Sequence, residues 1–182
     1  DHITVNLVVN RENLFPDNWI YIHSAEVQCA RIANYRNFAP AMCQPGTSAI
    51  SVEYFAFDGD ELWTKSDEAL LVLAKRELET LELVAEHDIG RGYVERQKES
   101  YPAYYAGYER EFTILRDYLD SFTNLTLIGR AGMYKYNNMD HALLTGMLAA
   151  ENLLGASHNL WDVNADDDYL ETIELSRTVT HV

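Results

Sequence analysis

Cysteine is scarce in this chain of 182 residues, which contains only Cys29 and Cys43. The two cysteines form neither a CxxC pair nor a spacing that would hold a metal ion. We expect both thiols to stay free in a reducing, cytoplasmic environment rather than to form a disulfide. The chain also has no internal repeat and no low-complexity block, which argues against a repeat protein or a disordered linker.

Basic residues are also few, since 14 lysines and arginines stand against 29 aspartates and glutamates, for a formal net charge of −15. This balance argues against binding to nucleic acid or to an anionic membrane surface. It does not exclude an anionic substrate, because arginines at one site can outweigh a distant acidic surface. No apolar run approaches the length of a membrane span, and the first residues do not resemble a signal peptide.

Several motifs of large enzyme classes are missing. No GxGxxG follows an N-terminal strand, so the dinucleotide-binding fingerprint is absent, and there is no GxSxG, HExxH or P-loop. The six histidines are scattered without ligand spacing, and we expect His141 to pack or cap a helix. A hydrolase or metalloenzyme therefore has little support. We predict no metal site and assign no catalytic residue.

What the sequence does contain is typical of a folded domain, with 47% hydrophobic and 12% aromatic residues. The length fits one domain, or one domain plus a piece of another. The chain opens directly on the strand-like stretch DHITVNLVV. We expect from this opening that a longer protein has been cut here.

Hydrophobic alternation predicts strands over 3–9, 19–23, 27–35 and 48–57, with a proline-containing loop at 38–47. The short connections between these strands favour antiparallel neighbours in one sheet.

Helical spacing follows Ser66, a good N-cap, and recurs over 107–122, with a polar strand candidate at 90–98. The predicted fold is α+β, an antiparallel sheet of about four to six strands with helices packed on one face. We divide the chain into a substrate-binding-type region at 1–123, a strand–turn–helix at 124–155 and an acidic tail at 156–182. Asp166, Asp167, Asp168 and Glu171 lie in this tail, which we expect to be solvated.

The region 124–155 has the most informative pattern. An apolar run at 124–128 predicts a buried strand, the glycines of Gly129-Arg130-Ala131-Gly132 break it, and Asn137 or Asn138 is a good N-cap for a helix over 139–154. A strand, a glycine turn and a capped helix can form a corner that receives an anion. A loop that feeds a core helix is the alternative, and spacing alone does not exclude it.

The segment 129–155, GRAGMYKYNNMDHALLTGMLAAENLLG, resembles the C-terminal flavin-contacting segment of FAD-dependent oxidoreductases of the amine oxidase and protoporphyrinogen oxidase type. It is similar above all to their relatives around UDP-galactopyranose mutase. The resemblance implies a strand and helix that return to an FAD domain absent from this chain. It also implies that Gly129, Arg130, Asn138, Met139 and Asp140 lie beside FAD.

Upstream segments carry a looser resemblance to the mutase family, namely CARIANYRNF at 29–38 and the pair Tyr101-Pro102. By this resemblance, Arg31, Tyr101, Arg130 and Tyr136 would bind substrate. Arginines donate to phosphate oxygens in a fork and tyrosine hydroxyls add neutral donors, so the chemistry is consistent. The structural alternatives are that Arg31 is a surface residue of a strand, and that Tyr101 and Tyr136 are aromatic residues of the core.

The segment NLFPDNWIYIHSAEV at 13–27 departs from the mutases and resembles bacterial oxidoreductase-like proteins of the same superfamily, and Asn138 stands where the mutases have an acidic residue. The resemblance therefore implies a fragment of an FAD-dependent oxidoreductase that acts on a small molecule and is inactive by itself. One alternative is a flavin-dependent nucleotide-sugar mutase of cell-envelope polysaccharide synthesis. A non-enzymatic interaction module is the third hypothesis. Homo-oligomers are compatible with each of the three.

Overall fold

The computed structural model describes residues 1–163, and the chain forms two compact units, Asp1–Ser100 and Tyr101–Val182. The predicted division at 123 differs from this one, because the helix before 123 belongs to the second unit. The acidic residues Asp166 to Asp168 and Glu171 of the predicted tail lie outside the described residues. No helix in the part of the chain that the structure describes is long and apolar enough to cross a membrane.

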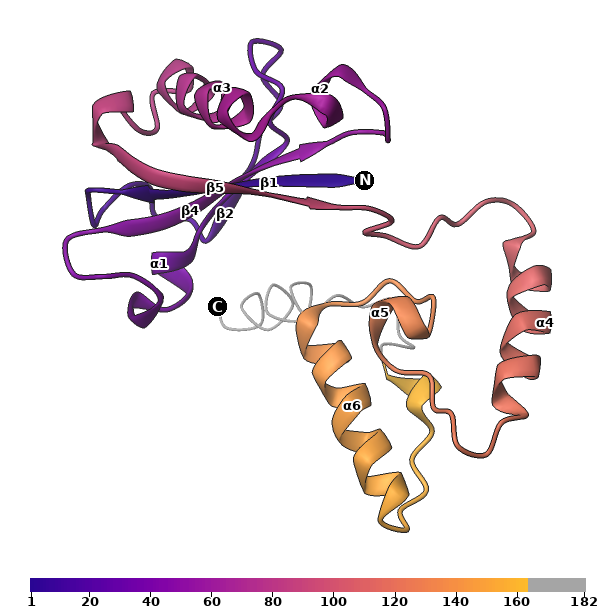
Figure 1. Cartoon of the computed structure of the whole chain (residues 1–182). Helices are drawn as coiled ribbons and strands as arrows, with labels where there is room; N and C mark the ends of the chain where they lie inside the picture. The colour runs from indigo at the N-terminus through magenta and orange to yellow at the C-terminus, as the bar shows by residue number, and fades with distance from the viewer. Residues whose placement is uncertain (164–182) are drawn as a thin grey trace, which may run out of the picture. The chain divides into compact units, whose positions relative to one another are not determined.

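The first unit is built on a five-stranded antiparallel sheet with the order β2-β3-β4-β1-β5 (Figure 1). Its strands are β1 (His2–Val9), β2 (Trp19–Tyr21), β3 (Arg31–Asn34), β4 (Ser48–Phe55) and β5 (Ile89–Gln97). The predicted antiparallel sheet is confirmed. The third strand, predicted at 27–35, is shorter than expected. Residues 27–30 precede it, because the amides of Gln28 and Cys29 donate to the Glu77 side chain, and at Tyr35 the chain turns into the one-turn helix α1 (Tyr35–Phe38).

Alternation along β1 creates the inner face of the sheet. Ile3, Val5, Leu7 and Val9 are buried, and the residues between them are only partly covered. On the neighbouring β4, Val52 pairs with Val5 and is also fully buried. The sheet therefore presents one apolar face, which the unit must cover.

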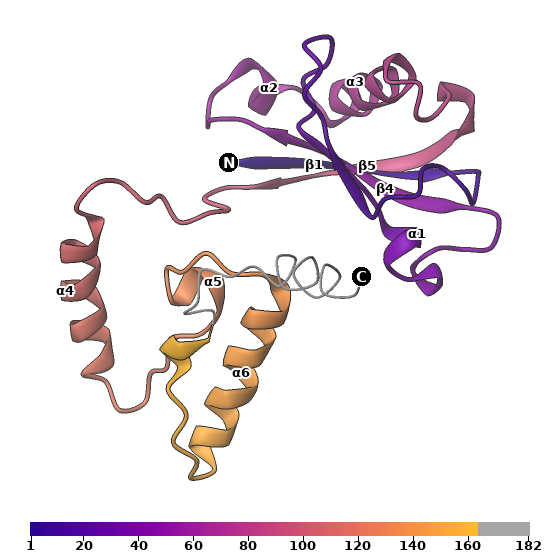
Figure 2. The same cartoon turned by 180° about the vertical axis from the view of Figure 1, so that it is seen from behind.

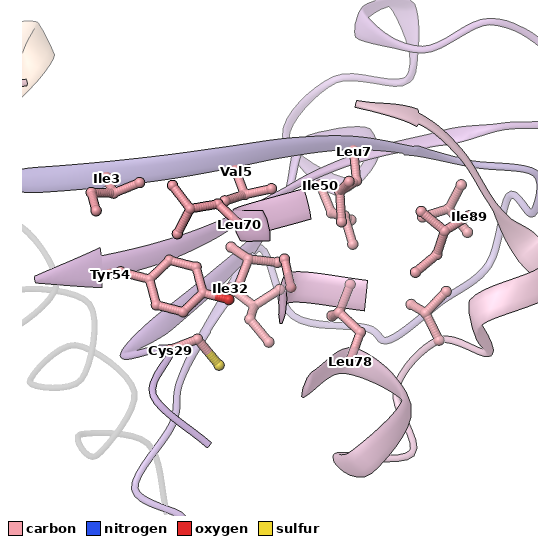
Figure 3. Close-up of a cluster of buried hydrophobic side chains, with 14 of the residues drawn as sticks. Ile3, Val5, Leu7, Cys29, Ile32, Ile50, Tyr54, Leu70, Leu78 and Ile89 are labelled. Carbon is pink, nitrogen blue, oxygen red and sulfur yellow. The ribbon is translucent and has the colours of Figure 1, made fainter. Parts of the chain in front are cut away.

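Helix α3 (Asp67–Thr80) covers that face, together with the short α2 (Glu61–Thr64). Ser66 caps α3 as predicted, since its Oγ accepts from the Ala69 amide at 3.2 Å. Leu70, Ala74 and Leu78 lie on the buried side of the helix. Figure 3 shows Leu70 and Leu78 among the strand side chains of the core.

A buried carboxylate joins α3 to the chain just before β3. Glu77 is 4% exposed, and its oxygens accept from the backbone amides of Gln28 at 2.7 Å and Cys29 at 3.2 Å, and from the Tyr54 hydroxyl at 2.9 Å. Burial and the Glu77 carboxylate raise the pKa of the Cys29 thiol to about 12. The same causes raise the pKa of Tyr54. These hydrogen bonds satisfy a charge that would otherwise be costly to bury.

The opposite face of the sheet is more open. The view in Figure 2 shows α1 on the side away from α2 and α3, so α2 and α3 follow the prediction of helices on one face and α1 does not. The 3-10 turns η1 (Pro40–Met42) and η2 (Glu86–Asp88) complete the first unit.

The second unit contains α4 (Tyr108–Asp120), α5 (Gly129–Gly132), α6 (Met139–Leu153) and the 3-10 turn η3 (Leu160–Asp162) (Figure 1). The helix predicted at 139–154 is confirmed. The strand predicted at 124–128 is wrong, because Asn124 lies in a turn and 125–128 pair with no strand in the described residues. Leu125 and Ile128 are exposed rather than buried. A strand needs a neighbour for its backbone hydrogen bonds, and residues 101–163 of this unit contain no strand that could supply them.

Candidate functional site

Arg130, the arginine of α5, lies against two stacked tyrosine rings in the second unit. The guanidinium carbon lies 4.8 Å from the ring centre of Tyr101 and 4.9 Å from that of Tyr136. The two rings are stacked, with centres 5.7 Å apart and planes 22° apart. Three of the four residues predicted to bind substrate therefore lie together. Cation–π contacts with both rings orient the guanidinium.

Arg130 also braces the start of α6. Its Nε and Nη2 donate to the Asn137 carbonyl oxygen at 3.1 and 2.5 Å. Nη1 has no hydrogen-bond acceptor among the described residues. One side of the guanidinium fork is thus committed to the fold, and only the Nη1 side is left for a ligand.

Gly129 allows the chain to enter this corner, since its φ of +69° lies in the left-handed region that favours glycine. Its amide donates to Thr145 Oγ1 at 3.1 Å, and this hydroxyl donates in turn to the Ala142 carbonyl at 2.8 Å. Thr145 is 1% exposed and is the one buried residue of α6. The contact fixes α5 against α6, and the sequence analysis missed it.

Asn138 is the N-cap residue of α6, as predicted, and the side chain of His141 makes a hydrogen bond at this end of the helix. The Asn138 amide donates to His141 Nδ1 at 3.2 Å, which confirms the capping role expected of His141. The amides of Met139 and Asp140 have no acceptor in the described part of the chain, and both side chains are exposed. Two free N–H groups at a helix N-terminus attract an acceptor or an anion.

Asn137 lies directly before this N-terminus and is 4% exposed. Its Oδ1 is buried without a hydrogen-bond partner. Buried polar atoms are nearly always paired, so this oxygen calls for a donor. The corner therefore offers an acceptor, free N–H groups and a guanidinium within one short segment.

Tyrosines stiffen the loop between α5 and α6. Tyr104 Oη accepts from the Tyr136 amide at 2.6 Å, and Tyr134 Oη donates to the Ala103 carbonyl at 2.9 Å. Tyr134 has a φ of +46°, which is uncommon for a side-chain-bearing residue. These contacts tie the segment that follows Tyr101 to the segment that carries Tyr136.

Arg31, the fourth predicted substrate residue, lies on β3 in the first unit. Its Nε and Nη2 donate to Glu53 Oε2 at 2.8 and 2.6 Å, and His2 Nε2 lies 3.1 Å from the same oxygen. Its guanidinium carbon also lies 5.8 Å from the Tyr21 ring centre. The strand register pairs Arg31 with Glu53. Arg31 is therefore held on the sheet by a carboxylate.

Glu53 is 5% exposed. Burial by itself raises the pKa of this carboxyl, but hydrogen bonds from His2 and Arg31 outweigh it and lower the pKa below its ordinary value. Sequence reasoning missed Glu53 and His2. A glutamate within the apolar strand SAISVEYF is a signal, but its partner depends on the register, which the sequence does not reveal.

No group of three or more histidine, cysteine, aspartate or glutamate side chains in residues 1–163 is arranged to hold a metal ion. The polar groups of the corner are hydrogen-bond donors and acceptors, a set suited to an organic ligand.

Comparison with known proteins gives a likeness in fold. No family model matches the chain, and no curated protein matches its sequence. A crystal structure of reduced UDP-galactopyranose mutase aligns with a TM-score of 0.70 at 17% identity, over 90% of this chain and 36% of that one. A protein from Exiguobacterium sp. 255-15, assigned as a protoporphyrinogen oxidase, aligns with a TM-score of 0.54 at 18% identity, over 71% of this chain and 29% of that one. The chain thus spans about a third of the length of these structures.

Proposed function

We propose that this chain is part of an FAD-dependent oxidoreductase, to which it contributes the substrate-binding domain and the C-terminal contacts with the flavin. The observation that carries the proposal is the corner in which Arg130 lies against the stacked rings of Tyr101 and Tyr136 beside the open N-terminus of α6. The fold likeness to a mutase and to an assigned oxidase agrees with it, as does the resemblance of 129–155 to flavin-contacting segments.

The groups at this corner fit the pyrimidine edge of a flavin. That edge carries carbonyl oxygens, which accept hydrogen bonds, and one ring N–H, which donates. The free amides of Met139 and Asp140 match the oxygens, and the unpaired Asn137 Oδ1 matches the N–H. Gly129 and Asn138 shape the backbone around the site. FAD, when bound, supplies the redox chemistry, and the protein supplies binding and orientation.

The substrate of the proposed enzyme is a small molecule with an oxygen-rich or anionic group. The Nη1 side of Arg130 can donate to such a group, and the hydroxyls of Tyr101 and Tyr136 add neutral donors. Arg31, which Glu53 orients on the sheet of the first unit, is a separate proposed substrate-binding residue. We assign these residues to binding and orientation, and none of them to a chemical step.

Flavin binding and reduction test this proposal. We expect the present chain to take up FAD weakly, because helix-terminus contacts with one edge of the flavin cannot replace a pyrophosphate and adenosine site. A longer product of the same gene should purify with bound FAD, and an amine or alcohol donor should bleach its absorbance. A longer product that binds no flavin would overturn the proposal.

A nucleotide-sugar mutase of cell-envelope polysaccharide synthesis is the second candidate. The mutase structure aligns with more of the chain than the assigned oxidase does, 90% against 71%. In this case the Arg130 corner would receive a pyrophosphate. UDP binding, together with isomerisation of a nucleotide sugar only after the flavin has been reduced, would favour the mutase over the oxidoreductase.

A further inference from the structure

A pocket of about 540 Å³ lies on the open face of the sheet in the first unit. Three neighbouring strands form its floor, and the segment after β3 contributes one rim. The pocket is lined in part by Asn6, Tyr35, Met42, Ala49, Arg91 and Tyr93. Its volume falls within the range of small-molecule sites, roughly 300–1,000 Å³.

The strand register explains why these side chains meet. Tyr93 pairs with Asn6 across β5 and β1, and Ala49 pairs with Val8 across β4 and β1. Val94 pairs with the core residue Val5 and therefore points to the helix-covered face. Alternation along β5 then puts Arg91 and Tyr93 on the open face with Asn6.

The walls of the pocket are aromatic and apolar. Tyr35 is anchored against β4, because its hydroxyl donates to Ser51 Oγ at 3.3 Å. The Tyr93 side chain is 61% exposed and that of Met42 is 57% exposed. Flat, polarisable surfaces of this kind favour a planar ring.

Arg91 is the only charged residue that lines the pocket. The other four arginines that lie on or beside the strands of this unit form ion pairs with carboxylates, namely Arg11, Arg31, Arg36 and Arg96. Arg91 has no ion pair or hydrogen bond among the described residues, and neither does the side chain of Asn6. Among the arginines of the described strands, Arg91 alone has no carboxylate partner, so its guanidinium can receive one from a ligand.

We propose that this pocket is a binding site for a small aromatic carboxylate. The ring lies against Tyr35, Tyr93 and Met42, and the carboxylate receives two hydrogen bonds from the Arg91 fork. The Asn6 amide adds a neutral donor. All of these residues belong to the first unit, so the site does not depend on Arg130 or on the proposed flavin chemistry.

A chemical-shift titration of the isotope-labelled chain with indole-3-acetate tests the site. The neutral indole-3-acetamide serves as its matched ligand, and acetate as an anion without a ring. We expect the strongest shifts at Tyr35, Arg91 and Tyr93. The acid should bind roughly tenfold more tightly than the amide, because only the acid forms a charge-assisted pair with the guanidinium. Acetate should bind weakly.

Two variants assign the parts of the site. Arg91→Gln should reduce the affinity for the acid to that for the amide and leave the amide unchanged, whereas Tyr93→Ala should weaken both. Arg76→Gln, at an exposed arginine of α3 outside the pocket, is the matched control and should change neither. Circular dichroism checks that each variant is folded.

Several results would overturn the proposal. Equal affinity for acid and amide, an Arg91→Gln variant that binds like the native chain, or shifts confined to other residues would exclude a carboxylate site at Arg91. Phenyl phosphate that binds more tightly than indole-3-acetate would exclude the carboxylate class in favour of a phosphate. None of these outcomes bears on flavin binding, so the two proposals fail separately.

Discussion

The two units of this chain cover their apolar side chains very differently. The hydrophobic core of the first unit is continuous, from Ile3 on β1 to Leu78 on α3. In the described part of the second unit, only Met133 and Leu160 are buried hydrophobic residues. On α6, the apolar stripe of Met139, Leu143 and Met147 is 81%, 64% and 63% exposed.

This contrast means that the core of the first unit can account for its stability, whereas the described residues of the second unit bury too little apolar surface to do so. Burial of apolar surface is the main force that holds a fold together. An uncovered stripe along a helix is typical of an element that packs against another partner. The alternative that α6 is an ordinary core helix is therefore not met within the described residues.

A matched pair of leucines gives the largest expected effect. Leu70→Ala on α3 should destabilise the first unit by about 2–5 kcal/mol, because the side chain is fully buried. Leu143→Ala on α6 should change stability by less than about 0.5 kcal/mol, since surface changes usually do. Urea unfolding of both variants measures the difference. Equal losses would show that the α6 stripe is covered in solution.

The buried carboxylate provides the next largest effect. Glu77→Ala removes the acceptor of two backbone amides and of the Tyr54 hydroxyl. We expect a loss of about 2–4 kcal/mol, because the donors stay buried without partners. Glu79→Ala, at an exposed position on the same helix, is the control. A loss at Glu77 no larger than at Glu79 would mean that water replaces the carboxylate.

Gly92 tests how closely β5 packs against β1 within the first unit. A Cβ atom there would lie 2.6 Å from Leu7 Cδ2 and 2.7 Å from the Asn6 carbonyl oxygen. The backbone oxygen cannot move without shifting the strand, so Gly92→Ala should cost about 1–3 kcal/mol in thermal or urea unfolding. Gly59→Ala is unsuitable as a control because its φ is +91°, whereas Gly132→Ala meets no atom within 4 Å. Gly132→Ala should be nearly neutral.

A substitution of Arg130 tests how the second unit holds the start of α6. Arg130→Ala removes two hydrogen bonds to the Asn137 carbonyl and two aromatic contacts, so we expect a local loss of about 1–2 kcal/mol. Hydrogen exchange should accelerate at the hydrogen-bonded amides of α6, which begin with Ala142, and stay unchanged in β1. Arg130→Lys should restore part of the protection. Unchanged exchange in α6 would show that Arg130 does not brace it.

Acidification should affect the first unit through Glu53, and we expect this to be the smallest of the effects. The pKa of Glu53 is lowered in the folded state, so its stabilisation is present above the ordinary glutamate pKa of about 4.3. This stabilisation is lost as the pH falls through the lower, folded-state pKa. Glu53→Gln should weaken the acid-induced shift of the urea midpoint. A variant with the same pH dependence as the native chain would contradict this assignment.

The sequence predicted the elements whose pattern is local. Alternation located β1 and β4, and a polar strand candidate located β5. The N-caps predicted at Ser66 and at Asn137 or Asn138 located α3 and α6. The strand at 124–128 was wrong because an apolar run indicates burial but not the presence of a neighbouring strand. Hydrophobic periodicity indicates which face of a segment could be buried, but it does not identify the element that would pack against that face.

The candidate site could be predicted from the sequence only in part. The grouping of Tyr101, Arg130 and Tyr136 agrees with the resemblance, although their roles stay predictions. The pairing of Arg31 with Glu53 could not be predicted, because it depends on the register of two strands. The unpaired Asn137 Oδ1 could not be predicted either, since burial of one atom is a property of packing.

The order of strands in the first unit also bears on how the protein behaves in concentrated solution. The two edges of the sheet are β2, which has only three residues, and β5, whose exposed positions include Arg91 and Glu95. A short edge and a charged edge both discourage strand-to-strand aggregation between molecules. Precipitation of this chain should therefore respond to changes along α6, such as Leu143→Lys, and hardly at all to changes at the sheet edges.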